Sequence, residues 1–421
     1  MALDIEDFRR RRRQREQQQR QRQAKRRRTL FIGAGAGVLL LILIGIILLI
    51  AGNTPPEDPT VSTPTETQTS TETSAPPPDT VIHFAMAGDL NINDTTVGAG
   101  GAAYDYTDAF MDVAHLLADA DITAVNLEGN LLGAPYGSDT VSAPQTMMEA
   151  LSAAGVDLVQ LANSYSINAG IAGLNDTIQG VRSAGMIPLG VYTDREEYEK
   201  HGGFTIVNVK GLRVAFVAFT KGMDGMALPA GSEHCVNVLY TDYDSTYQDV
   251  DTEGINAVLQ RVSAQSPDVT IALLHWGSEF NNTISSSQKK ICQLMLDGGV
   301  DAVIGTHSHY VQQMTLDPET GTFVAYSLGD FFSDAQQPGS EYSVILDLEI
   351  TRDNTTGETS ITNYSYTPIF SVVEEGKDAK VLRIHQAMRA YEAAYLERVT
   401  QKTYEAMAYA LQRIEARVTG E

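Results

Sequence analysis

The chain has 421 residues and a formal net charge of −23, from 53 Asp and Glu against 30 Lys and Arg. Residues 1–28 hold 12 of the 30 basic residues, so residues 52–421 carry 18 basic against 49 acidic residues, a net charge of −31. So acidic a segment repels nucleic acids and other polyanions unless a metal ion or a local basic pocket offsets the charge. The chain has only two cysteines, which argues against a cysteine-based metal site.

Residues 30–51 form an uncharged run, rich in Leu and Ile, directly after the basic residues. At about 1.5 Å per residue, a helix of this length crosses a hydrocarbon core of roughly 30 Å, which predicts a transmembrane helix. The alternatives are a buried core helix and a cleaved signal peptide, whose apolar region usually has only about 7 to 15 residues. The basic flank predicts a single-pass protein of the cell membrane, with a cytoplasmic N-terminus that contacts anionic lipid and an extracellular C-terminal domain.

Residues 52–80 are almost wholly Thr, Ser, Pro and Glu. This composition cannot bury a core, so we expect a disordered stalk. The predicted plan is a basic cytoplasmic tail at 1–29, a transmembrane helix at 30–51, the stalk at 52–80, an α/β domain at 81–373 and a C-terminal helical extension at 374–421.

From residue 81 onward, apolar runs alternate with helix-forming segments, which predicts an α/β domain. The predicted strands lie at 81–87, 122–127 and 157–162, near 187 and 204, and at 214–219, 270–274, 302–304 and 323–327. Helices are predicted at 104–120, 144–154 and 170–184, with further helical segments between the later strands. Residues 343–351 and 360–366 alternate apolar and polar side chains, as antiparallel strands do. Residues 379–418 lack Gly and Pro and predict a long helical segment.

Polar side chains follow several predicted strands at the point where each one ends. They are Asp89, Asn126, Glu128, Asn163, His275, Glu279, His307 and His309. A parallel sheet gathers the carboxyl ends of its strands along one edge, where open α/β sheets bind ligands. Carboxylate, amide and imidazole groups together suit Mn, Mg, Zn or Fe. We therefore predict a divalent metal site built from Asp89, Glu128, Asn163, His275, His307 and His309.

His307 and His309 stand two residues apart, after an apolar strand and Gly305. On an extended segment they would point to the same side and could hold one metal ion together. The alternative is ordinary structure: loop histidines with common hydrogen bonds, a turn cap at Asp89 and a packed core histidine at His275. The sequence contains no GxSxG elbow, P-loop or HExxH motif that would indicate other chemistry.

These residues resemble the capsule-synthesis CapA family, bacterial poly-γ-glutamate biosynthesis accessory proteins related to calcineurin-like metallophosphatases. The resemblance covers residues 82–368 and rests on six motifs: AGD at 87–89, NLE at 126–128, LAN at 161–163, LHWGxE at 274–279, DxVIGxHxHxxQ at 301–312 and YSLGDF at 326–331. It implies a two-sheet sandwich flanked by helices, with the motif loops meeting at one end. It also implies membrane association and a part in making, exporting or anchoring an anionic capsular polymer.

One motif departs from the family pattern. After LAN the family usually has Asn-His and a later Asp, whereas this chain has Ser164-Tyr165 and Asn168. In the metallophosphatases that histidine acts as the general acid, and tyrosine, which titrates near 10, replaces it poorly at neutral pH. The loop after Asp89 also lacks the histidine of the DxH motif.

Two functions therefore stay open. One is a metal-dependent hydrolase of phosphoesters or amides, with His275, Glu279 and Tyr165 as candidate catalytic residues. The other is a non-catalytic protein that binds the capsular polymer or serves as a scaffold for its membrane synthase. Whether Cys235 and Cys292 form a disulfide is also open.

Overall fold

The computed structural model describes residues 2–10, 14, 78–373, 378–395 and 399–420. The predicted transmembrane helix at 30–51 lies outside these residues, as do most of the predicted tail and stalk. Within the described ranges, no helix combines the length and the apolar character needed to cross a bilayer. Met1–Phe8 and Pro78–Glu421 belong to one compact unit, which contains both β-sheets.

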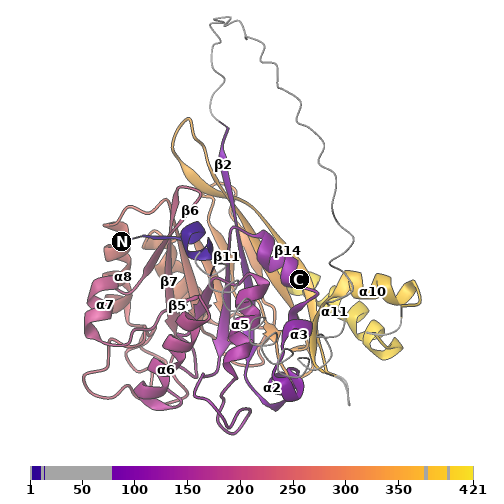
Figure 1. Cartoon of the computed structure of the whole chain (residues 1–421). Coiled ribbons are helices and arrows are strands. Elements are labelled where there is room, and N and C mark those ends of the chain that lie inside the picture. Colours follow the sequence, from indigo (N-terminus) through magenta and orange to yellow (C-terminus); the bar gives the residue numbers. More distant parts are fainter. Residues whose placement is uncertain (1, 11–13, 15–77, 374–377, 396–398, 421) are drawn as a thin grey trace, which may run out of the picture. The chain divides into compact units, whose positions relative to one another are not determined.

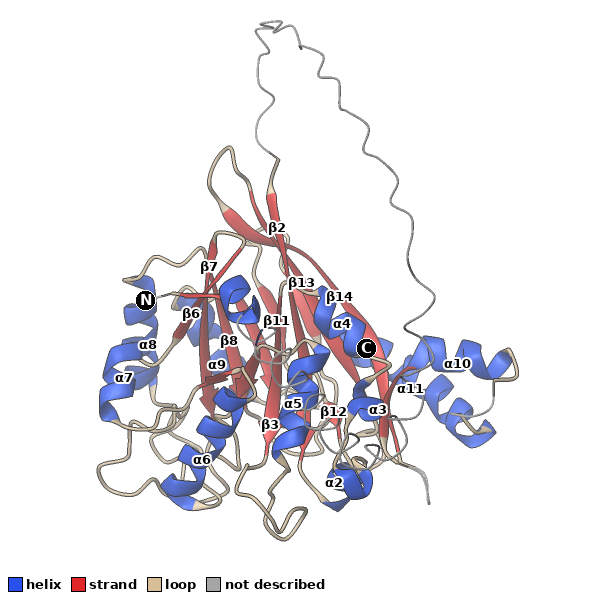
Figure 2. Ribbon diagram, viewed as in Figure 1, coloured by secondary structure: helices blue, strands red, loops and turns tan. Residues whose placement is uncertain are grey.

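Two β-sheets stack face to face with helices on their outer sides (Figures 1 and 2). The first sheet runs in the order β15 (Lys380–Arg383), β14 (Thr359–Val372), β13 (Tyr342–Arg352), β2 (Thr80–Asn91), β3 (Ile122–Glu128), β4 (Leu158–Gln160) and β5 (Ile187–Leu189), with β12 (Asp330–Phe332) paired to β2. The second sheet runs in the order β1 (Leu3–Asp4), β6 (Thr205–Val209), β7 (Leu212–Thr220), β8 (Val269–His275), β9 (Ala302–Thr306), β11 (Phe323–Ala325) and β10 (Met314–Leu316). The predicted sandwich flanked by helices is confirmed.

Each sheet has its own helical cover. The outer face of the first sheet packs against α2 (Asp94–Gly98), α3 (Thr107–Phe110), α4 (Ala114–Asp119), α5 (Gln145–Ala154) and α6 (Gly170–Ser183). The outer face of the second sheet packs against α8 (Thr252–Ser263) and α9 (Ser286–Asp297). Two smaller helical elements, η2 (Gly101–Ala103) and α7 (Arg195–His201), lie in the connections. The order is therefore helices, sheet, sheet, helices.

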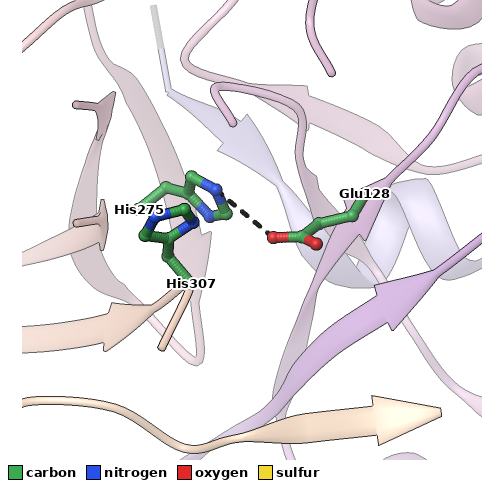
Figure 3. A group of neighbouring side chains, drawn as sticks. All are labelled: Glu128, His275 and His307. Carbon is green, nitrogen blue, oxygen red and sulfur yellow. Dashed lines mark ion pairs between the residues drawn. The ribbon is translucent and has the colours of Figure 1, made fainter. Parts of the chain in front are cut away.

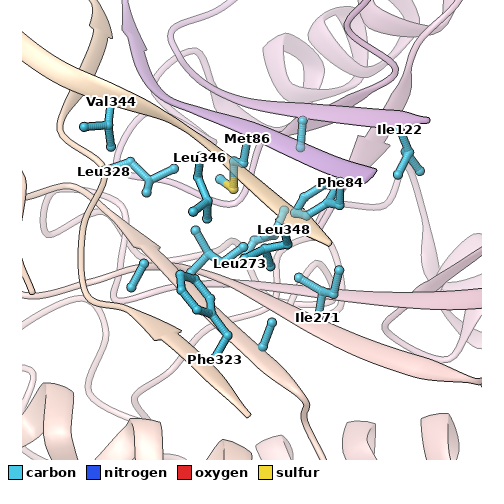
Figure 4. Packing of buried hydrophobic residues seen from close by; sticks show 14 of the residues in the cluster. Phe84, Met86, Ile122, Ile271, Leu273, Phe323, Leu328, Val344, Leu346 and Leu348 are labelled. Carbon is cyan, nitrogen blue, oxygen red and sulfur yellow. The ribbon is translucent and has the colours of Figure 1, made fainter. Parts of the chain in front are cut away.

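The core between the sheets follows from the alternation of side chains along each strand. Phe84 and Met86 of β2 face Ile271 and Leu273 of β8 across the sandwich (Figure 4). Residues that alternate with them point the other way: Ala272 and Leu274 of β8 belong to the cluster that packs against α9. Each such apolar side chain contributes about 1.5–3 kcal/mol when fully buried. The packed layers hold the strand ends in fixed positions.

The prediction of a C-terminal helical segment was wrong for the first residues of that segment. Residues 380–383 form β15, which pairs antiparallel with β14 and buries Val381 and Leu382. Here the free edge of the sheet outweighs helix propensity, which is a weak preference. Two helices follow, α10 (Ile384–Glu392) and α11 (Gln401–Thr419), and the buried face of α11 packs on the core between the sheets.

The structure also tests the predicted helix at 104–120, the predicted antiparallel strands and the two cysteines. The predicted helix at 104–120 begins only at Thr107, because Tyr104 has left-handed backbone geometry and the buried Tyr106 hydroxyl donates to the carbonyl of Val97. It is also broken into α3 and α4 at residues 111–113. The antiparallel pairing of residues 343–351 with 360–366 is confirmed as β13 against β14. Cys235 and Cys292 are both free and buried, so no disulfide joins them.

The N-terminal residues make a contact that the sequence did not predict. Leu3 and Asp4 pair in parallel with Val207 and Asn208 of β6, and Ile5 is only 1% exposed. A segment paired in this way must lie on the same side of a membrane as the domain. This pairing and a cytoplasmic tail at 1–29 therefore exclude one another in a single anchored chain.

Candidate metal centre

The strand ends of both sheets meet at one site. The first sheet contributes Asp89 from β2, Asn126 and Glu128 from β3, Asn163 after β4, and Asp330 from β12. The second sheet contributes His275 from β8, and His307 and His309 directly after β9. Strand-end reasoning alone put these residues on the edge of one parallel sheet, whereas they come from both sheets, as the two-sheet sandwich implied by the family resemblance allows. The carboxylates and amides come from one sheet and the histidines from the other.

Glu128, His275 and His307, called here the Glu128 group, place one ligand atom each within 4.8 Å of the others. Figure 3 shows the carboxylate facing the two imidazoles, with Glu128 Oε1 3.2 Å from His275 Nε2. That close approach lacks hydrogen-bond geometry, so Glu128 Oε1 has no hydrogen-bond partner, and neither has His307 Nδ1. A buried polar atom left unpaired costs about 1–3 kcal/mol. A divalent cation fits the donor set of this group, and an ion bound through these two atoms would remove that cost.

Asp89, His309 and Asp330, called here the Asp89 group, also place one ligand atom each within 4.8 Å of the others. Here the protein supplies most of the partners. His309 Nδ1 lies 2.8 Å from Asp330 Oδ1, and Asp89 accepts hydrogen bonds from the His307 backbone N–H at 2.9 Å and from Asn126 Nδ2 at 2.7 Å. The parallel pairing of β12 with β2 sets Asp330 opposite Asp89.

Burial sets the protonation of the carboxylates and of two histidines. It raises the pKa of Asp89 to about 6, with a further contribution from the nearby Asp330 charge, and it raises the pKa of Glu128 well above its usual range. It lowers the pKa of His275 and His307 well below the usual value. Both imidazoles are therefore neutral at pH 7 and can offer a lone pair to a metal ion.

His309 behaves in the opposite way. Burial alone would lower its pKa, but the charge and hydrogen bond of Asp330 prevail and raise the pKa well above the usual value. Its side chain is 10% exposed and that of Asp330 is 3% exposed, so solvent screens this pair little.

The structure separates the two histidines that we expected to hold one ion together. The backbone there is not extended, because φ is +87° at His307 and +57° at His309. Both residues occupy the left-handed region, which costs about 1–3 kcal/mol for a non-glycine residue and often marks a functional site. Their ring centroids lie 6.3 Å apart, and each ring joins a different ligand group.

Asn163 lies beside the site but in neither group. Its Nδ2 donates to Leu127 O at 2.6 Å and to Asn126 Oδ1 at 3.1 Å, and its Oδ1 accepts from the Tyr165 backbone N–H at 3.0 Å. Asn126 in turn holds Asp89. In this arrangement Asn163 orients the Asp89 group, and its part as a direct ligand stays a prediction.

A pocket of about 80 Å³ opens onto Glu128, His309 and Asp330. Two of the candidate catalytic residues, Tyr165 and Glu279, line it, whereas His275 is fully buried and is not in its lining. Burial raises the pKa of Tyr165 to about 12, and the surrounding carboxylates add to the shift. The phenol is therefore a weak proton donor for a leaving group at neutral pH.

Sequence reasoning missed two residues of this site. Asp330 stands in the YSLGDF motif but was not assigned as a ligand, because only its pairing opposite Asp89 reveals the contact. Lys221 directly follows β7, and its Nζ donates to Gly277 O at 3.0 Å and lies 3.3 Å from His307 Nε2. Its placement after a strand is the same signal that identified the histidines.

The sequence is similar to a known protein family and to curated proteins of that family. Residues 83–335 match the family model described as bacterial capsule synthesis protein PGA_cap. The capsule biosynthesis protein CapA of Bacillus anthracis is 26% identical over 222 residues, which cover 51% of this chain and 49% of that protein. The PGA biosynthesis protein CapA of Bacillus subtilis is 23% identical over 201 residues, 48% of each chain. The chain thus spans about half the length of these curated relatives.

Among solved structures, a calcineurin-like phosphoesterase of Bacillus subtilis aligns with a TM-score of 0.43 and 15% identity, over 79% of this chain and 100% of that one.

Proposed function

We propose, from the premise that this chain belongs to the bacterial capsule synthesis protein family PGA_cap, that it takes part in making, exporting or anchoring an anionic capsular polymer. Poly-γ-glutamate is the first candidate, because the relatives are named for capsule and PGA biosynthesis. The matched residues 83–335 include every member of both ligand groups. The candidate metal centre therefore belongs to the part of the chain that defines the family.

The site is proposed to hold a divalent metal ion, with Mn, Zn, Fe and Mg as candidates. The observation that carries this proposal is the buried pair of unpartnered atoms, Glu128 Oε1 and His307 Nδ1. Glu128, His275 and His307 would hold one ion, and Asp89, His309 and Asp330 form the second group of ligands. When bound, such an ion offsets the acidic charge of the site and polarises an oxygen of an anionic ligand.

The residues of this chain favour polymer binding over hydrolysis. Tyr165 occupies the place of the general acid, and its pKa of about 12 leaves it protonated and weakly acidic. Hydrolysis remains the second candidate function, because the Glu279 carboxylate lines the pocket beside Glu128 and could accept a proton.

Polymer binding by the full chain in detergent tests this proposal. We expect Mn²⁺-loaded protein to bind poly-γ-glutamate, and binding to weaken at least about 10-fold with a chelator or in Glu128→Gln, which removes one charge-assisted contact to the ion. Glu149→Gln, an exposed change on α5, is the matched control. Equal binding in all four conditions would contradict the proposal. Release of γ-glutamyl fragments by wild type but not by Glu128→Gln would establish the hydrolase instead.

A single-pass anchor at 30–51, with the domain outside the cell and a polymer or membrane synthase as partner, is part of the same proposal. Support comes from the apolar run and its basic flank. Protease added to intact cells should remove the domain, and a protected domain would contradict the topology. An impermeant maleimide should fail to label Ala2→Cys on intact cells, and labelling would favour the β1–β6 pairing over a cytoplasmic tail.

A further inference from the structure

Lys221 is a partly buried cation beside His307 that belongs to neither ligand group. It follows β7, and its side chain lies over the ring of Tyr247 at 4.7 Å from the ring centroid. The ammonium has three N–H donors, of which one is directed at Gly277 O and one approaches His307 Nε2. Among the ion pairs of the described residues, Lys221 has no carboxylate partner. Its charge is therefore not neutralised by a direct ion pair.

Lys221 approaches a different nitrogen of the His307 ring from the one that lacks a partner. Nε2 of that ring faces the ammonium, whereas Nδ1 is the nitrogen without a partner. Nδ1 can hold an ion only in the tautomer that carries its hydrogen on Nε2, and in that tautomer Nε2 no longer accepts from the ammonium, which leaves this donor of Lys221 for another acceptor. Within the described part of the chain, no other Lys or Arg forms a hydrogen bond or ion pair with a member of either ligand group.

The pocket that opens onto the ligand groups is strongly acidic. Lys221 is not in its lining; burial lowers the pKa of the Lys221 ammonium, and the charge of Glu279, which is in the lining, opposes that shift. Glu128, Glu279, Asp330 and Asp334 line the pocket, and the one basic side chain in its lining, His309, is already paired with Asp330. An anionic ligand entering such a pocket needs positive charge, because like charges at short range repel by several kcal/mol in a partly buried site. A metal ion would supply part of that charge, and a fixed ammonium next to it would supply more.

We propose that Lys221 binds an oxyanion of the ligand, a carboxylate or a phosphate group, beside the metal centre. The inference rests on the proposed function and names the residue that selects anionic ligands at that site. A lysine ammonium suits this part because its remaining donor can form a charge-assisted hydrogen bond, which is stronger than a neutral one. The alternative interpretation is that Lys221 only orients the imidazole ring of His307 and binds no ligand.

Anion titrations of the full chain in detergent separate the two readings. Mn²⁺ affinity is measured first, and then inorganic phosphate and the dipeptide γ-Glu-Glu are titrated into Mn²⁺-loaded protein by calorimetry. We expect Lys221→Met to keep Mn²⁺ affinity within about 2-fold and to weaken one or both anions by about 10- to 100-fold, the worth of a charged hydrogen bond. Lys221→Arg should restore part of the affinity, and Lys289→Met, an exposed change on α9, should match wild type.

Each outcome decides the inference. A loss confined to phosphate or to γ-Glu-Glu supports Lys221 and identifies which oxyanion it selects. Unchanged affinity for both anions overturns the inference, as does a Mn²⁺ affinity lost together with anion binding, which would make Lys221 a positioning residue for His307. A wild type that binds no Mn²⁺ contradicts the proposed metal centre instead. The anions are then titrated into the ion-free protein, where loss in Lys221→Met supports the inference and equal affinity overturns it.

Discussion

The Glu128 group and the Asp89 group contain similar ligands at the same strand ends, yet the protein satisfies them to different extents. In the Asp89 group, His309 pairs with Asp330 at 2.8 Å, and Asp89 accepts two hydrogen bonds. In the Glu128 group, one carboxylate oxygen and one imidazole nitrogen are buried without partners. The Asp89 group can therefore stand without an ion, whereas the Glu128 group carries a cost that an ion would remove.

This difference in hydrogen bonding assigns the two groups different roles: the Asp89 group stabilises the fold, and the Glu128 group binds the ion. Removing a satisfied partner leaves a buried charge behind and lowers the stability of the fold. Removing an unsatisfied group costs the ion-free fold little and should abolish ion binding instead. Variants in the two groups are thus expected to show opposite signatures.

The largest effect is expected from Asp330→Ala in the Asp89 group. It leaves protonated His309 buried without its partner, so the free energy of unfolding in the presence of a chelator should fall by about 3–5 kcal/mol, as for other broken buried pairs. Because the pKa of His309 is raised, the pair stabilises the fold fully below the unfolded pKa and loses this contribution as the pH rises through the folded pKa. Urea denaturation at pH 6 measures it. A loss no greater than that of Asp334→Ala, in the same pocket, would contradict the assignment.

Next in size is the effect of Glu128→Gln on ion binding. Mn²⁺ affinity should fall by more than about 100-fold, or about 2.7 kcal/mol, because a direct ligand outweighs an outer partner. Burial already raises the pKa of Glu128 well above its usual range, so a neutral amide of the same shape should leave the ion-free stability unchanged or higher. Calorimetry and urea denaturation on the same samples test both halves. A marked loss of ion-free stability would erase the contrast between the groups.

Addition of Mn²⁺ should stabilise the fold in a pH-dependent way. At a concentration about 100 times Kd, binding adds about 2.7 kcal/mol to the free energy of unfolding. The gain should be smaller at pH 5.5 than at pH 7.5, because the pKa of Asp89 is raised to about 6 and its carboxyl group must lose a proton to bind the ion. Thermal unfolding at both pH values measures the gain. An equal increase in Tm at both would contradict proton release on ion binding by Asp89 and by Glu128, whose pKa is also raised.

The smallest effect is expected from Phe280→Ala. Phe280 stacks on His309 with ring centroids 4.6 Å apart and an interplanar angle of 19°. Such a contact contributes about 0.5–1.5 kcal/mol, so stability should fall by no more than this and less than in Asp330→Ala. Urea denaturation of both variants compares them. A larger loss for Phe280→Ala would mean that stacking, and not the carboxylate, holds His309.

The general place of the candidate site was predictable from the sequence, because each strand is visible as an apolar run and the polar residues stand where these runs end. Asp89, Glu128, His275, His307 and His309 were found in this way, and all five lie in the two groups. Their division between the groups was not predictable, since it depends on the left-handed backbone at His307 and His309.

Contacts between distant segments were missed for a related reason. Asp330 reaches the site only because β12 pairs with β2, and Val381 is in a strand only because the edge of β14 is free to pair. Neither pairing leaves a local signal. The helix propensity of residues 379–418 pointed the other way at β15, and tertiary pairing prevailed over it.

Metal content tests the central claim most directly. The full chain in detergent, dialysed to equilibrium against Mn²⁺ and then analysed by elemental mass spectrometry, should retain at least one ion per chain in wild type. The Glu128→Gln, His307→Ala double variant should retain none, and His385→Ala, an exposed histidine on α10, should match wild type. Equal metal content in wild type and in the double variant would contradict a metal centre at these strand ends.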